Sequence, residues 1–262
     1  MSTNEQIIVE QRDAVLKITL NRPEKMNAWT PQMMGELTST ITAANDDNAI
    51  GAIVVTGAGR GFCAGADIGA VFDKNLKEGG REEAAPDRPG TNWVALCRES
   101  KPLIAAINGA SIGVGLTLVL PFDQILAAKG AKLSCRFVKM GLVPELASSH
   151  FLTVRCGFGA ASWLALSGAT VLAEEAKELG LVDRVCEPDA LLPEAMAMAD
   201  ELAANPPTQL RLIKQLLTRN ASEPDLATVQ RREIEAMTVA YKTPEHAEAV
   251  AAFLERRAPV FR

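Results

Sequence analysis

The order of apolar and polar residues along the chain predicts short β-strands separated by helices. An alternating pattern marks the first two strands, which are expected to form a hairpin through residues 11–13, and continuous apolar runs mark three buried strands. The predicted strands are 7–9, 15–20, 50–56, 103–107 and 124–127. The segments between the buried strands are long enough for crossover connections, so we expect parallel pairing and an α/β fold.

Helical patterns follow the hairpin and dominate the C-terminal part. Thr30 before Pro31 predicts a helix start, and an apolar stripe continues that helix to about Ala44. The helices predicted beyond Pro188 are 189–204, 208–219, 226–241 and 245–257. Pro206 and Pro207 interrupt this run, so the sequence indicates a core at 1–205 and a helical region at 206–262.

The last helices carry more apolar residues than a small appendage can bury. Their stripe includes Leu210, Ile213, Leu216 and Leu217, which are expected to pack on the core or on a neighbouring chain. Residues 73–91 are rich in charge, Gly and Pro. They show neither the helical nor the strand pattern of apolar residues, which predicts a surface loop. Such a loop is either a tolerated insertion or a functional lid.

Composition limits the possible partners. The 262 residues are 48% hydrophobic and carry 27 basic against 32 acidic side chains, a formal net charge of -5. This balance gives no overall attraction to nucleic acid or to an anionic membrane, so an anionic ligand must be held by local groups. The first residues lack a basic and apolar leader, and no apolar run reaches the roughly 20 residues that span a bilayer. We therefore expect a cytoplasmic protein.

Cysteine and histidine usage narrows the chemistry. The five cysteines are odd in number and widely spaced, which fits neither a disulfide framework nor a zinc pattern, so we expect reduced, buried thiols. With His150 and His246 as the only histidines, a histidine-rich metal site is excluded, and a Ser-His-Asp triad would need one of these two. No metal is expected.

Two glycine-rich segments each follow an apolar run. Residues 61–68 read G-F-C-A-G-A-D-I and residues 108–115 read N-G-A-S-I-G-V-G. Glycine lets a ligand approach the backbone, and the first amides of a helix carry partial positive charge. Each segment alone also fits a plain tight turn. Two such ends can aim N–H groups at one oxygen, so together they favour an oxyanion hole and chemistry on a carbonyl group.

Four segments in order resemble the crotonase (enoyl-CoA hydratase/isomerase) superfamily. They are R-P-E-K-M-N-A, V-T-G-A-G-R-G-F-C-A-G-A-D-I, K-P-L-I-A-A-I-N-G-A-S-I-G-V-G and L-S-G-A-T-V-L-A-E-E-A-K-E-L-G-L-V-D-R-V. The resemblance covers nearly the whole chain. It implies a crotonase-type spiral of repeated ββα units, a helical C-terminal trimerisation region, and an acyl-CoA thioester as substrate.

The resemblance also implies positions for the site. The family's oxyanion hole uses the backbone N–H groups that correspond to Ala66 and Val114. Valine departs from the usual glycine; it keeps the N–H, but its branched Cβ narrows the approach. The residues that the resemblance places around the coenzyme A thioester are Lys25, Asn27, Ala28, Ala64, Gly65, Asp67, Ile68 and Gly113.

Alternative readings accompany several of these residues. Lys25 and Arg60 are suited to phosphates but also fit solvated surface cations. Asp67 is expected to orient its loop rather than to transfer protons. The resemblance further implies that Phe253 and Arg257 in the last helix reach the coenzyme of a neighbouring chain.

The departures from the family pattern decide the expected reaction. Hydratases of this family use two glutamates, and the corresponding positions hold Thr117 and Phe137, which cannot act as carboxylate bases. A carboxylate stands instead at Glu145 in G-L-V-P-E-L-A-S-S, a segment that resembles one branch of the Δ3,Δ2-enoyl-CoA isomerases. Without the family, Glu145 also fits a glutamate that is favoured before a helix start. His150 nearby is expected to pack rather than to catalyse.

We therefore expect an isomerase that shifts the double bond of a 3-enoyl-CoA to give a 2-enoyl-CoA, with Glu145 as the single acid/base and no cofactor beyond the coenzyme A of the substrate. One base and two N–H donors suffice for this reaction. Other crotonase reactions remain alternatives: isomerisation of a ring-derived acyl-CoA, hydration, dehalogenation or thioester hydrolysis. A non-catalytic RNA-binding relative is a further alternative that the acidic balance disfavours. A homotrimer or a pair of trimers is expected.

Overall fold

The computed structural model describes residues 5–69 and 92–262, so the expected loop at 73–91 lies outside the described residues. The strands are β1 (Ile7–Arg12), β2 (Val15–Leu20), β3 (Ala52–Gly57), β4 (Gly61–Cys63), β5 (Leu103–Ile107), β6 (Ala110–Ile112), β7 (Gln124–Ala128), β8 (Lys132–Ser134), β9 (Thr170–Leu172) and β10 (Arg184–Cys186).

The α-helices are α1 (Pro31–Asp46), α3 (Trp93–Glu99), α4 (Val114–Thr117), α5 (Ser148–Ser167), α6 (Ala173–Glu178), α7 (Leu191–Ala203), α8 (Pro207–Asn220), α9 (Leu226–Ala240) and α10 (Pro244–Glu255), and two 3-10 helices are η1 (Pro23–Lys25) and η2 (Arg136–Met140). The predicted start of α1 is confirmed, because the Thr30 side chain accepts a hydrogen bond from the Met33 amide and Pro31 opens the helix.

The hairpin turn lies later than predicted. β1 runs on to Arg12, which pairs with Val15, and Asp13 turns the chain with a φ of 50°. The predicted strand ended at Val9 because residues 10–12 are polar, and every residue of β1 after Ile7 is exposed. The physical cause is that an edge strand buries little of either face.

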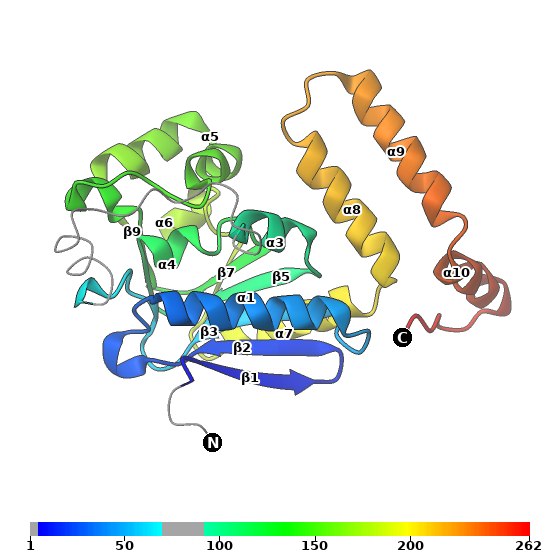
Figure 1. The fold of residues 1–262 in the computed structure, drawn as a ribbon, viewed down its shortest axis with the longest axis horizontal. Coiled ribbons are helices and arrows are strands. Elements are labelled where there is room, and N and C mark those ends of the chain that lie inside the picture. The colour runs from blue at the N-terminus through cyan, green and yellow to red at the C-terminus, as the bar shows by residue number, and fades with distance from the viewer. Residues whose placement is uncertain (1–4, 70–91) are drawn as a thin grey trace.

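Six strands form the larger sheet in the order β1-β2-β3-β5-β7-β10. Among the described strands of this sheet, β1 with β2 is the antiparallel pair, and β2, β3, β5, β7 and β10 run parallel. This confirms the predicted parallel α/β architecture. Helix α7 packs on β2, β3 and β5, and Figure 1 shows the helices of the core gathered around this sheet.

A second, four-stranded sheet has the order β4-β6-β8-β9. Its strands have three residues each, and β4 and β6 come from the two glycine-rich segments. The sequence patterns did not predict these strands, because three-residue runs with glycine lack a detectable period. The small sheet matters because it holds the two segments in parallel register, with Gly61 opposite Ala110.

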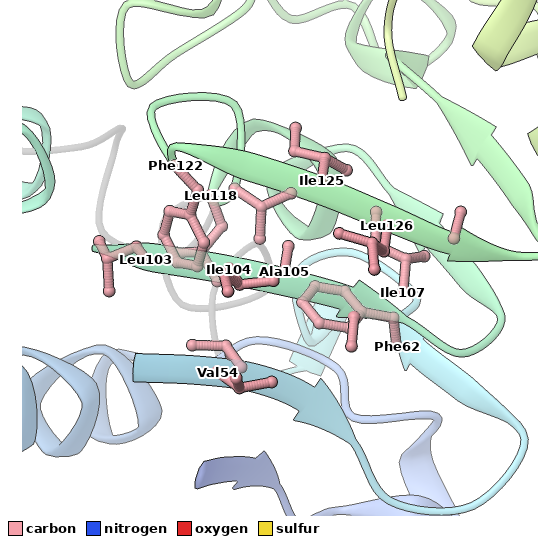
Figure 2. Close-up of a cluster of buried hydrophobic side chains, with 14 of the residues drawn as sticks. Val54, Phe62, Leu103, Ile104, Ala105, Ile107, Leu118, Phe122, Ile125 and Leu126 are labelled. Atoms are coloured by element: carbon pink, nitrogen blue, oxygen red, sulfur yellow. The ribbon is translucent and has the colours of Figure 1, made fainter. Parts of the chain in front are cut away.

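The core takes side chains from both sheets and holds both glycine-rich segments in place. Figure 2 shows side chains from β3, β4, β5 and β7 packed in one cluster, with Phe62 of the first segment facing Ile107. Phe62 and Ile107 are fully buried, and Leu118, which follows the second segment, is buried as well. Full burial of one apolar side chain of this size stabilises the fold by about 1.5–3 kcal/mol. These buried side chains therefore anchor the backbone of both segments to the core.

The C-terminal helices form an arm beside the core. Figure 1 shows α8 next to the core and α9 with α10 farther out, and α8 packs on α3 and on α9. Much of the predicted apolar stripe is open in the single chain: Ile213 is 53% and Leu217 is 65% exposed. Among the described helices, none is long and apolar enough to cross a membrane.

Candidate functional site

The two glycine-rich segments lie directly against each other. A Cβ built on Gly65 would lie 3.3 Å from the carbonyl oxygen of Ile112, and one on Gly115 would lie 2.2 Å from that of Cys63. Gly113 has a φ of 55° with a ψ of -121°, a conformation that side chains resist. The glycines therefore allow the two backbones to approach closely. This brings together the predicted residues Ala66, Gly65, Gly113 and Val114.

The local backbone pairing does not use the amides of Ala66 and Val114 in the described residues. Trp29 pairs with Ala66 as an isolated parallel bridge, in which the Trp29 amide donates to Gly65 and the Asp67 amide donates to Trp29. The Ala66 amide faces away from this pairing. Val114 is the first residue of α4 and has no partner within that helix. In the described residues, neither amide donates a hydrogen bond to another main-chain group.

The predicted cradle segments around Ala28 and Ala64 are also joined. The Ala64 amide donates to the Met26 carbonyl at 3.0 Å. Arg22 links the same two segments, because its guanidinium donates to the Ala28 carbonyl at 2.6 Å and forms an ion pair with Asp67 at 2.8 Å. Sequence reasoning missed this role of Arg22, although the R-P-E-K-M-N-A motif contains it. Asp67 is thus held in its loop, as expected.

Asn27 lies in the predicted cradle and has a structural side chain. Its side chain is fully buried, accepts from the Arg22 amide at 2.8 Å, and donates to the carbonyls of Ala58 and Gly61 at 2.9 and 2.8 Å. Its side-chain polar atoms are all used inside the protein, so the amide group shapes the cradle. Contact of the Asn27 backbone with a substrate stays a prediction.

Three predicted binding residues lie open to solvent. Lys25 and Ala64 are exposed, and Ile68 is 64% exposed just before the end of the described segment. Ala28 is half-buried. An exposed lysine and open backbone at this rim fit a surface on which a long polar ligand can lie.

Glu145 lies at the first corner of an unusual turn. The Ser148 amide donates to the Glu145 carbonyl at 3.0 Å, and the two residues between them, Leu146 and Ala147, have φ values of 55° and 54°. Left-handed backbone costs a residue with a Cβ about 1 kcal/mol, and such strain gathers at functional positions. Glu145 is half-buried, and α5 begins directly after the turn.

The two positions that correspond to the glutamates of the family's hydratases are buried and carry no carboxylate. Thr117 is fully buried, with its hydroxyl 3.5 Å from the Val114 carbonyl, and Phe137 is 8% exposed in η2. The Glu145 turn connects to the glycine-rich segments through β8, because the Gly113 amide donates to Ser134 at 2.8 Å and η2 follows that strand. Glu145 follows η2 along the chain and precedes α5.

Two buried polar atoms beside these residues lack partners. Within the described residues, the buried side-chain atoms without a hydrogen bond are Trp29 Nε1, Ser148 Oγ and Gln209 Oε1. Trp29 is paired with Ala66 and Ser148 closes the turn of Glu145, so two of the three adjoin the candidate site. Buried polar groups are nearly always satisfied, and exceptions call for an explanation.

The nearby histidine and cysteine are poor candidates for catalysis. His150 is exposed and stacks edge-on against Phe151, with ring centroids 5.3 Å apart. Burial raises the pKa of the Cys63 thiol to about 11, so it stays protonated at neutral pH. The five cysteines are free, and four of them are buried, which confirms that expectation.

The last helix presents Phe253 openly and uses Arg257 internally. Phe253 is 82% exposed. Arg257 pairs with Glu248 at 2.5 Å and with Glu255 at 2.6 Å. Contact of either residue with a neighbour's coenzyme stays a prediction, and Arg257 would have to leave these carboxylates to make it.

Comparison with known proteins agrees with this arrangement. Residues 10–262 match the family described as enoyl-CoA hydratase/isomerase. The chain is 37% identical over 259 residues to a probable enoyl-CoA hydratase of Mycobacterium bovis, covering 99% of this chain and 98% of that protein. It is 35% identical over 262 residues to 1,2-epoxyphenylacetyl-CoA isomerase of Escherichia coli, covering 97% of each.

Solved structures give the same result. The chain superposes on the crystal structure of an enoyl-CoA hydratase from Polaromonas with a TM-score of 0.89 and 31% identity, over 98% of this chain and 99% of that one. The fold is therefore the crotonase fold that the four segments indicated. The match of sequence, fold and glycine-rich segments places this chain in the enoyl-CoA hydratase/isomerase (crotonase) family.

Proposed function

We propose that this chain is an acyl-CoA isomerase that converts a 3-enoyl-CoA to a 2-enoyl-CoA, with Glu145 as its acid/base. One observation carries the proposal: the hydratase positions hold the buried Thr117 and Phe137, while a carboxylate stands at the strained Glu145 turn. Phe137 also removes room for a reactive water, since its ring occupies the position of a carboxylate that would orient one.

The proposed chemistry needs one base and one anion site. Glu145 takes a proton from the α-carbon of the acyl chain, and the electron pair moves onto the thioester oxygen to form a dienolate. The amides of Ala66 and Val114 stabilise this oxygen. Glu145 then returns the proton to the γ-carbon, the double bond settles next to the thioester, and the enzyme ends as it began. No redox step or external cofactor enters this balance.

In this proposal the coenzyme A portion lies along the cradle. Lys25 is placed to meet a phosphate, and the backbone of Ala28, Ala64, Gly65 and Gly113 lines the path to the oxyanion site. Asp67, Asn27 and Arg22 keep that backbone in position through the bonds described above. Ile68, which is exposed beside the path, is proposed to contact the acyl or pantetheine chain.

Two other reactions have support from relatives' names. Hydration of an enoyl-CoA is favoured by the probable hydratase of Mycobacterium bovis, and isomerisation of a ring-derived acyl-CoA is favoured by the epoxide isomerase of Escherichia coli. Both pass through an acyl thioester oxyanion or a related polarised carbonyl. A panel of 3-enoyl-CoA, 2-enoyl-CoA and ring-derived epoxide substrates separates the three reactions.

The decisive experiment is Glu145→Gln, which keeps shape and removes basicity. Isomerisation of 3-enoyl-CoA is expected to fall at least about a hundredfold while binding of a saturated acyl-CoA is nearly unchanged. Glu175→Gln, an exposed glutamate on α6, is the matched control and should keep wild-type turnover. Near wild-type turnover of Glu145→Gln would show that another residue is the base.

A further inference from the structure

Ser148, which follows the proposed base Glu145 by three residues, carries a buried hydroxyl. Ser148 is 1% exposed, and in the part of the chain that the structure describes its Oγ has no hydrogen-bond partner. A buried hydroxyl is costly to leave unpaired, because it has given up its water without replacement. Folding alone would favour alanine here.

Helix capping does not account for this serine. Serine stabilises a helix start when it stands at the N-cap and accepts from an amide of the first turn. In α5 the N-cap is Ala147 in left-handed conformation, no side chain makes a cap hydrogen bond, and Ser148 stands one position later. The local sequence rule is broken where the backbone is also strained, a combination expected at functional sites.

The turn brings the backbone of Ser148 close to that of Glu145. The hydrogen bond from the Ser148 amide to the Glu145 carbonyl closes a four-residue turn, so the two Cα atoms are within about 7 Å. The two left-handed residues between them hold the corner. A glutamate side chain can bridge that separation, and rotation of the serine about its Cα–Cβ bond breaks no existing hydrogen bond.

We infer that Ser148 is a positioning residue for the proposed base: its hydroxyl donates a hydrogen bond to the Glu145 carboxylate when that carboxylate turns toward the substrate. This inference rests on the proposed function. A base that serves two carbons of one acyl chain must be held between them, and a third group commonly orients a catalytic base in this way. The bond to a carboxylate is charge-assisted, whereas the unpaired hydroxyl gains nothing in the free protein.

The test compares Ser148→Ala with Ser149→Ala, its exposed neighbour. Ser148→Ala is expected to lower kcat for 3-enoyl-CoA isomerisation about tenfold or more with KM nearly unchanged, because a hydrogen bond to a charged group is lost. The melting temperature should stay equal or rise, since an unpaired buried hydroxyl is replaced by a methyl group. Ser149→Ala should match the wild type in all three quantities.

A double-mutant cycle separates positioning from packing. In the Glu145→Gln background, Ser148→Ala should cause no further loss of rate, because the group that it positions no longer acts. A second measurement, exchange of the α-protons of hexanoyl-CoA with D2O followed by NMR, needs the base but no double bond. Ser148→Ala should slow this exchange by the same factor.

The failures are distinguishable. If Glu145→Gln abolishes both reactions while Ser148→Ala keeps wild-type kcat and exchange, the positioning inference is overturned and the proposed function stands. An equal loss from Ser148→Ala in both backgrounds also overturns it, since the effect would then not pass through Glu145. If Glu145→Gln keeps wild-type rates, both proposals fall together.

Discussion

Gly115 lies in backbone contact with Cys63, at a distance that leaves no room for a side chain. A Cβ on Gly115 would sit 2.2 Å from the Cys63 carbonyl oxygen and 2.8 Å from the Cys63 Cβ. Both residues are buried, and each belongs to one of the two glycine-rich segments. The spacing between the proposed oxyanion donors, Ala66 and Val114, thus depends on a glycine next to one of them.

Gly115→Ala is therefore expected to push the two segments apart. The contact is with backbone, which cannot rotate away, so the free energy of unfolding should fall by about 1–3 kcal/mol. Isomerisation should fall more than thioester binding, because the paired amides stabilise the oxyanion rather than the ground state. Urea unfolding and steady-state kinetics measure the two effects.

Gly35→Ala is the control for this change. Gly35 is exposed inside α1, and a Cβ there meets nothing within 4 Å. Alanine should stabilise this helix by about 0.5–1 kcal/mol and leave kinetics alone. Similar effects of the two substitutions would show that the contact with Cys63 does not set the site.

Hydration is predicted to be much slower than isomerisation on the same preparation. Thr117 and Phe137 replace the carboxylates that would activate and orient water, and both side chains are buried. Hydration of a 2-enoyl-CoA and isomerisation of the matching 3-enoyl-CoA are compared by absorbance and product analysis. Hydration as fast as isomerisation would mean that Glu145 positions water without help, or that the two positions were matched wrongly.

Lys214 is predicted to anchor the C-terminal arm on the core. Its side chain is 7% exposed and pairs at 2.6 Å with Asp123, which also binds Arg98 at 3.1 Å and accepts from the Leu103 amide at 2.8 Å. Burial lowers the pKa of Lys214, and Asp123 opposes that shift. Lys214→Ala removes one partner of a buried pair and should cost about 3 kcal/mol in unfolding free energy.

Lys242→Ala gives the comparison for this anchor, because Lys242 is an exposed lysine that follows α9. Its loss should change stability by less than about 0.5 kcal/mol. Proteolysis of the arm in both variants shows whether Lys214 holds α8 down. Equal stability and equal protection would contradict an anchoring role.

The chain end is predicted to respond to acid only at very low pH. Hydrogen bonds from Arg257 and from the Val260 amide lower the pKa of Glu248 from 4.5 to about 2. Because the folded pKa is the lower one, the stabilisation is complete above about pH 4.5 and is lost as the pH falls toward 2. The NMR shift of the Val260 amide should keep its neutral value at about pH 3.5. A transition near 4.5 would contradict the pairing, and Glu248→Gln should show the released shift at neutral pH.

Assembly into a trimer or a hexamer is the last prediction. The arm exposes large apolar side chains, including Leu226 at 77%, Phe253 at 82% and Leu254 at 74%, more than a separate chain of this size usually shows. A closed oligomer would cover them. Sedimentation at micromolar concentration should exclude a 28.0 kDa monomer as the main species. A truncation after Ala204 that kept the native assembly would remove the proposed role of these helices.

Local sequence signals were enough to predict the elements whose local preferences match the fold. Thr30 and Pro31 start α1 as predicted, and the continuous apolar runs of β3, β5 and β7 became parallel buried strands. The glycine-rich segments indicated a site built from backbone N–H groups, because glycine allows a ligand or another segment to approach the backbone closely. The four motifs in their order indicated the family, whereas composition alone did not.

The tertiary structure decided what depends on partners far apart in the chain. The side chain of Asn27 holds Ala58 and Gly61, 31 and 34 residues away, and Arg22 gained its role through Asp67, 45 residues away. By its sequence, Lys214 fits a surface lysine of an amphipathic helix. In the fold, α8 brings it into an ion pair with Asp123. The left-handed turn after Glu145 and the unpaired hydroxyl of Ser148 break local rules, so only the packed structure, which stabilises such exceptions, could determine them.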